Sequence, residues 1–280
     1  MKTTVAALAD AARKKAELAA REPLRYLVLS ALAGAYVGLG IVLIFSIGSP
    51  LAAAGAPGTK ALMGASFGIA LTLVVFAGSE LFTGNNLVMT LGSLERTVSW
   101  GATLRVWGLS FVGNVAGSLL LAAMTAATGL VAKAPLKDFV LQVSAAKMAA
   151  PVRELFFRGL LCNVLVCLAI WTAARTKEDL AKLVLIFWCL FGFIGAGFEH
   201  SVANMTLLGL ALLVPHDPAL VSWAGFVRNL VPVTLGNVVG GAVLVAGSYW
   251  YATRERPALV ADPVTGERAP VLHPEPVREG

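Results

Sequence analysis

Long apolar runs alternate with short polar connections along the chain, and this pattern predicts six membrane-spanning helices. The runs cover residues 24–48, 61–91, 104–131, 151–174, 183–214 and 230–251. About 20 consecutive apolar residues suffice for a helix to cross a bilayer. The second and fifth runs are longer than that and carry glycines and polar residues inside them, so a broken helix is predicted in each.

The segments outside these runs are more polar. Residues 3–22 repeat apolar positions at helical spacing against charged ones, which predicts a helix lying on the membrane surface. Residues 133–148 are predicted to be a polar connection, and the tail is rich in Pro, Glu and Arg. We therefore divide the chain into an N-terminal cytoplasmic surface helix (1–23), a six-helix transport domain (24–253) and a disordered cytoplasmic tail (254–280).

The composition supports an integral membrane protein. Of the 280 residues, 58% are hydrophobic and 14% are charged, whereas about a quarter of a soluble domain is charged. The apolar runs are continuous, which favours an all-α membrane protein over a β-barrel. Most of the 22 Lys and Arg residues fall on one side of the predicted spans. The positive-inside rule then places both termini in the cytoplasm. The expected location is a bacterial-type cytoplasmic (inner) membrane. Because these residues mark topology, no nucleic-acid partner is expected.

The two predicted helix breaks resemble each other. Residues 77–85 align with residues 196–204 without a gap and share Ala, Gly, Glu and Asn at four positions. A Gly-Asn pair at 113–114 likewise corresponds to one at 236–237, although the first and fourth spans show no convincing match. With three spans in each half, this predicts an inverted 3+3 repeat, an arrangement typical of a substrate path at the membrane midplane.

The carboxylates in these breaks are predicted to be structural. A helix that restarts inside the membrane presents free N–H groups and partial positive charge, which suit an anion. An exposed carboxylate would repel that anion. Glu80 and Glu199, together with Asn204, are therefore predicted to brace the broken helices, with the carboxylates accepting hydrogen bonds from the loose backbone.

His200 has the only side chain in the spans that ordinarily titrates near neutral pH. One interpretation is a core histidine bonded to the backbone; the other is a pore-centre group that gives a hydrogen bond or a proton to a weak-acid anion. His216 and His273 lie in a loop and the tail, so no metal site is expected. The adjacent Glu-His-Ser residue types cannot by themselves form a catalytic triad, so neither an enzyme nor a bound cofactor is expected.

Four segments in a fixed order resemble the formate/nitrite transporter family. They are GSELFTG at 78–84, LCNVLVCLAIW at 161–171, GFEHSVANM at 197–205 and VPVTLGN at 231–237. The resemblance covers residues 23–253 and is strongest to the nitrite-channel branch of the family. It implies an aquaporin-like six-helix protomer that assembles as a homo-pentamer in the lipid bilayer, with one pore in each protomer.

The resemblance also implies roles for individual residues. The pore centre falls on His200, Thr83 and Asn163. The two hydrophobic constrictions fall on Leu71, Leu81 and Phe82, and on Phe67, Val166 and Phe193. The vestibule lysine falls on Lys147, and Arg158 would add to anion attraction if it faces the same vestibule.

The implied function is transport of small monovalent weak-acid anions, with nitrite as the expected substrate and protons as a partner if transport is proton-coupled. A formate or hydrosulfide channel of the same fold remains an alternative. A channel for neutral solutes is a further alternative, but the chain lacks the paired Asn-Pro-Ala motifs expected of an aquaporin.

Overall fold

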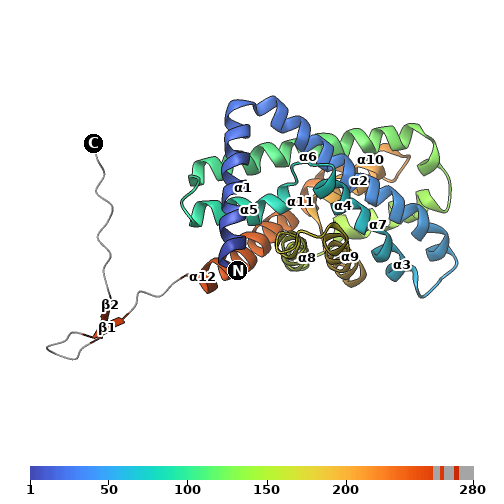
Figure 1. The fold of residues 1–280 in the computed structure, drawn as a ribbon. Coiled ribbons are helices and arrows are strands. Elements are labelled where there is room, and N and C mark those ends of the chain that lie inside the picture. Colours follow the sequence, from blue (N-terminus) through green and yellow to red (C-terminus); the bar gives the residue numbers. More distant parts are fainter. Residues whose placement is uncertain (255–258, 262–267, 271–280) are drawn as a thin grey trace.

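The structure is a computed structural model that describes residues 1–254, 259–261 and 268–270. Within these residues, six helical segments are long and apolar enough to cross a membrane. They are Pro23–Ala53, Thr59–Phe76, Trp100–Ala127, Val152–Ala173, Asp179–Ala196 and Trp223–Thr253. The prediction of six spans is therefore confirmed, and the chain is a multi-pass membrane protein whose spans are all helical (Figure 1).

Four of the spans are single helices, and two are composite. The single helices are α2 (Pro23–Ala53), α6 (Trp100–Ala127), α8 (Val152–Ala173) and α9 (Asp179–Ala196). The second span joins α3 (Thr59–Ser66) to α4 (Gly68–Phe76). The sixth joins α11 (Trp223–Val238) to α12 (Ser248–Thr253) through a π-helical segment, η2 (Val239–Gly247).

Two half-length helices, α5 (Phe82–Leu94) and α10 (Ser201–Leu213), lie inside the bundle and follow the predicted breaks. Nearly all of their residues are buried. The chain enters both breaks through a glycine in the left-handed region, Gly78 at φ 75° and Gly197 at φ 77°, where other residues are strained. Both helix breaks are therefore confirmed.

Small residues bring the flanking helices into backbone contact. α2 packs along α6, and α8 packs along α11 and η2. A Cβ atom on Gly117 would overlap the carbonyl oxygen of Ala31, and one on Gly240 would overlap that of Leu160. Such contacts are typical of membrane helices, which gain stability from close packing rather than from the hydrophobic effect.

The N-terminal helix, α1 (Lys2–Arg21), packs against α5 and α6 through its apolar face. The helix itself is as predicted, but one of its faces rests on protein rather than on lipid. On its outer face the Lys14 ammonium, and then the Arg13 guanidinium, hold the pKa of the exposed Asp10 carboxyl below its ordinary value. Figure 1 places α1 and α12 at the same end of the bundle.

The opposite end of the bundle carries α3 and α7 (Leu136–Ala149), which follows the short 3-10 turn η1 (Leu130–Ala132) (Figure 1). Residues 133–148, predicted to be a polar connection, are thus mostly helical, because α7 packs an apolar face on α2, α10 and α11. In the tail, β1 (Leu259–Ala261) pairs with β2 (Arg268–Pro270) in antiparallel orientation. The rest of the predicted disordered segment lies outside the described residues.

Candidate functional site

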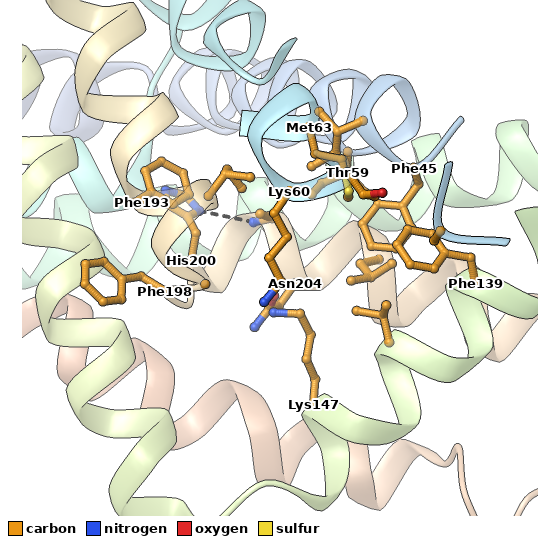
Figure 2. A pocket seen from close by; sticks show the side chains of 18 of the residues that line it. Phe45, Thr59, Lys60, Met63, Phe139, Lys147, Phe193, Phe198, His200 and Asn204 are labelled. Carbon is orange, nitrogen blue, oxygen red and sulfur yellow. Dashed lines mark hydrogen bonds between the residues drawn. The ribbon is translucent and has the colours of Figure 1, made fainter. Parts of the chain in front are cut away.

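A cavity of about 570 Å³ is bounded by α2, α3, α7, α9 and α10. Its walls are mainly apolar and include Phe45, Phe139, Phe193 and Phe198 (Figure 2). Its polar lining residues are Thr59, Lys60, Lys147, His200 and Asn204. The cavity thus leads from the α3 and α7 end of the bundle to the break before α10.

Beyond this cavity lies a much smaller apolar chamber, of about 10 Å³. Its lining comprises Val37, Phe67, Ala70, Leu71, Leu81, Val166, Leu190, Phe193 and His200. Phe193 and His200 border both spaces, so the cavity narrows directly into the chamber. A space of this size holds about one water molecule, so a hydrated ion does not fit.

Five of the six residues predicted to form constrictions surround this one chamber; Phe82 is absent from its described lining. The ring of Phe82 instead packs edge-on against Phe111 on α6, with 5.3 Å between ring centroids. Leu81 is the extended N-cap of α5, and Phe82 is the first helical residue. Leu81 therefore lines the chamber, while Phe82 is directed toward α6.

His200 combines the two roles that the sequence left open. It caps α10, where its Nδ1 accepts a hydrogen bond of 3.1 Å from the Ala203 N–H. Its Nε2 lies 3.0 Å from Thr83 Oγ1. Because Nδ1 is an acceptor, the neutral ring carries its proton on Nε2 and donates it to the Thr83 hydroxyl. The histidine is thus fixed by the backbone and also faces the chamber.

Thr83 and Asn163 lie behind this histidine and are fully buried. The Asn163 Nδ2 group donates to Thr83 O (3.2 Å), Asn86 Oδ1 (3.1 Å) and Asn237 O (2.6 Å). Its two hydrogens are therefore engaged by the protein, while its Oδ1 has no hydrogen-bond partner among the described residues. In this arrangement Asn163 positions the backbone behind Thr83, and direct hydrogen bonding of its NH₂ group to a substrate stays a prediction.

Two asparagines hold the backbone at the breaks. Asn237 Oδ1 accepts from Ser201 N–H at 3.0 Å, while its Nδ2 donates to Gly159 O at 2.7 Å and Glu199 O at 3.1 Å. At the other break, Asn114 Oδ1 accepts from the first N–H of α5 at 2.9 Å. An amide side chain can accept and donate together, so one residue joins the two sides of a break.

Asn114 completes the same pattern with its Nδ2, which donates to Ser30 O at 2.7 Å and Glu80 O at 3.0 Å. The backbone of the two breaks is also bonded to α2 and to α8. Glu80 N–H donates to Leu29 O, and Glu199 N–H donates to Arg158 O, each at 3.2 Å. The two breaks are thus held by corresponding contacts to α2 and α6 on one side and to α8 and α11 on the other.

Among the described residues, the hydrogen-bond partners of the Glu80 and Glu199 carboxylates are side chains and not the loose backbone N–H groups that were expected, while their bracing role stays a prediction. Glu199 accepts from Lys147 Nζ at 2.7 Å and from Asn204 Nδ2 at 2.6 Å. Its side chain is 4% exposed. Asn204 Nδ2 also donates to Asn229 Oδ1 at 2.8 Å. A carboxylate only accepts, so it suits a cluster of donors, while the asparagines bind the backbone.

Glu80 is held in the same manner. It accepts from Lys15 Nζ at 2.6 Å, from Tyr26 OH at 2.7 Å and from Asn85 Nδ2 at 3.1 Å. Lys15 comes from α1, so the N-terminal helix is bonded to the first break. Arg158, by contrast, is absent from the described lining of the cavity. Its guanidinium pairs with Glu154 at 2.6 Å, and its role in anion attraction stays a prediction.

Several residues of this site were not predicted from the sequence: Lys15, Tyr26, Lys60, Asn114, Asn229 and Asn237. The repeated Gly-Asn pairs were a usable signal for the two asparagines that hold the breaks. The other four residues show no such signal in the sequence, because their partners are distant in the chain. The described residues contain no group of three or more His, Cys, Asp or Glu side chains placed to hold a metal ion.

A family profile described as formate/nitrite transporter matches residues 2–251. The chain belongs to the formate/nitrite transporter family. It is 48% identical over 258 residues to the nitrite transporter NirC of Salmonella typhimurium strain LT2, covering 91% of this chain and 94% of that protein. Among solved structures, it resembles an FNT family ion channel with a TM-score of 0.86 and 46% identity, covering 91% of this chain and all of that one.

A pentameric formate channel with formate bound is also similar, with a TM-score of 0.71, 28% identity, and coverage of 82% of this chain and 96% of that chain. Membership confirms the predicted family. Since the family is one of transporters, it also confirms that the chain is not an enzyme. The cavity, the chamber and His200 are therefore features of a transport protein.

Proposed function

We propose that this chain transports nitrite, as a small monovalent weak-acid anion, along a path from the cavity past His200 into the apolar chamber. The observation that carries the proposal is this narrowing. A space of about 570 Å³ contracts to one of about 10 Å³ at a point where His200 is the only polar lining residue described. The 48% identity to a nitrite transporter supports nitrite as the substrate.

The chamber sets the physical problem for the substrate. An unpaired charge in an apolar enclosure loses most of its hydration, and the penalty is far larger than for a neutral molecule of the same size. A weak-acid anion avoids this penalty by taking up a proton before it crosses. Chloride, the anion of a strong acid, has no such route.

His200 governs how that proton is supplied. In the neutral ring, Nε2–H is directed at Thr83 Oγ1, so an anion takes this hydrogen bond by displacing the Thr83 hydroxyl or by sharing the donor with it. Outright proton transfer requires a second ring proton on Nδ1, which displaces the Ala203 N–H bond. Losing such a bond and leaving the N–H unsatisfied costs about 1–3 kcal/mol. We therefore propose that His200 binds the anion as a neutral donor and shares a proton only when α10 briefly loses this cap.

Flux measurements in proteoliposomes test the proposal. His200→Asn keeps a preferred N-cap for α10 but removes the Nε2–H, whereas His200→Phe removes both. We expect wild-type nitrite influx to rise as pH falls and to exceed chloride influx, and both variants to lose nitrite flux. His200→Asn should retain wild-type stability. Equal passage of chloride and nitrite, or full nitrite flux in His200→Asn, would contradict the mechanism. Preference for formate or hydrosulfide in the same assay would reassign the substrate.

We also propose that the protein is a homo-pentamer in the inner membrane, with both termini in the cytoplasm. The similarity to a pentameric formate channel supports the assembly. The position of α1 and α12 at one end of the bundle supports termini on one side (Figure 1). The corresponding contacts of Asn114 and Asn237 support an inverted repeat of two three-span halves. In that arrangement the cavity faces the periplasm.

A further inference from the structure

Lys60 carries a charge in the cavity that is not neutralised by any other described side chain. Among the described residues that line the cavity, only Lys60 and Lys147 carry a formal charge. The Lys147 ammonium lies 2.7 Å from the Glu199 carboxylate, so this pair adds no net charge. Lys60 forms no salt bridge among the described residues.

The location of Lys60 is also unfavourable for its own helix. It is the second residue of α3, whose first turn contains no acidic residue. A lysine at the positive end of a helix dipole destabilises the helix slightly. The side chain is exposed and points into the cavity from the α3 wall, while Lys147 approaches from the α7 wall (Figure 2). The charge and the dipole thus add to one positive potential in this cavity.

We propose that Lys60, and not Lys147, supplies the net positive charge that draws monovalent anions into the cavity before they reach His200. The inference rests on the proposed function and names the residue that recruits its substrate. The apolar walls around Lys60 focus its field, because low-dielectric surroundings raise the local concentration of counter-ions. Lys147 instead keeps the buried Glu199 paired and so maintains the break before α10.

The expected effect follows from the size of one charge. At about 7 Å in water-like surroundings, a unit charge changes the local concentration of a monovalent anion about threefold at low ionic strength. The Debye length is about 30 Å at 0.01 M salt and below 10 Å at 0.2 M. Removing Lys60 should therefore lower the rate at low salt and have little effect at high salt.

The test is nitrite influx into proteoliposomes at sub-saturating nitrite, measured at 0.01 M and 0.2 M ionic strength. Lys60→Met should reduce influx about threefold at the lower ionic strength, and Lys60→Glu, which reverses the charge, about sevenfold. Lys60→Arg should match wild type. Lys133→Met is the matched control, because Lys133 is an exposed lysine in the loop before α7, outside the described lining.

A second test restores the charge at position 60 by chemical modification. Because the reagent does not cross the membrane, it modifies only those protein molecules whose cavity faces the outside of the liposome. Lys60→Cys is treated with a membrane-impermeant methanethiosulfonate that adds either an ammonium or a sulfonate. The ammonium should restore influx at low salt and the sulfonate should lower it further. Wild type receives both reagents as a control for the native Cys189, which is partly exposed.

The outcomes separate this inference from the proposed function. If wild type conducts nitrite while Lys60→Met equals Lys133→Met at 0.01 M, the inference fails and the proposed function stands. An equal loss in Lys60→Met at both ionic strengths also refutes it, because attraction by one exposed charge is screened. If wild type passes no nitrite at all, the proposed function fails and this inference with it. Lys147→Met should lose flux to a similar degree at both ionic strengths.

Discussion

The asparagines at the two breaks should contribute equally and substantially to stability, and Asn237→Ala tests this directly. The substitution removes three hydrogen bonds from a site with no solvent exposure. Gly159 lies inside α8, so its carbonyl keeps the usual helical partner. The loss therefore falls mainly on Ser201 N–H and Glu199 O, two backbone groups in the break.

Each buried backbone group left without a partner costs about 1–3 kcal/mol, so we expect Asn237→Ala to lower the free energy of unfolding by roughly 3 kcal/mol. Asn114→Ala should lose a similar amount, because its three bonds differ from those of Asn237 by no more than 0.1 Å. Asn237→Asp keeps the acceptor but turns both donors into lone pairs that face carbonyl oxygens. It should be at least as damaging as the alanine.

The assay is reversible unfolding in mixed micelles with an increasing fraction of SDS, followed by tryptophan fluorescence. Ser118→Ala is the matched control, since Ser118 is equally buried but makes a single hydrogen bond of 3.3 Å, to Gly34 O. Its cost should stay at about 1 kcal/mol or less. The reasoning would be refuted if either asparagine variant were no less stable than Ser118→Ala, or if only one break proved sensitive.

Three further outcomes follow from the packing and the ion pairs. Lys147→Met leaves the nearly buried Glu199 carboxylate without its cation and should lower the free energy of unfolding by about 3–5 kcal/mol in the same assay. The double variant with Glu199→Gln should recover much of this loss, and no recovery would contradict the pairing. Gly117→Ala places a Cβ in the Ala31 backbone and should reduce the yield of folded protein in size-exclusion chromatography, while Gly108→Ala, which meets nothing within 4 Å, should fold as well as wild type. Lys15→Met should speed amide exchange of α1 about tenfold, as expected for losing roughly 1.4 kcal/mol, and the exposed-pair control Lys14→Met should leave it unchanged.

How much of this could be predicted differs between the fold and the site. The six spans and both breaks follow from the length of the apolar runs and from the glycines inside two of them. These are local properties that can be read directly from the sequence. The same local pattern marked His200 as exceptional. The polar connection at 133–148 was misjudged because α7 has an apolar face that only its packing against α2, α10 and α11 makes visible.

The correspondence of the first and fourth spans shows why sequence comparison has a limit. These spans show no convincing match in residue type, yet Leu29 and Arg158 accept equivalent hydrogen bonds from Glu80 and Glu199. The acceptors are backbone carbonyl oxygens, which every residue possesses. A contact of this kind leaves no trace in the identity of the residue that makes it.

By itself, then, the sequence determined the membrane class, the spans, the positions of the breaks and the family. Tertiary structure decided which polar groups are paired. Glu199 engages Lys147 across 52 positions of the chain, and this leaves Lys60 as the unneutralised charge in the cavity. Electrostatic roles depend on distance in space, and spacing along the chain does not reveal which of two lysines has a carboxylate within 3 Å.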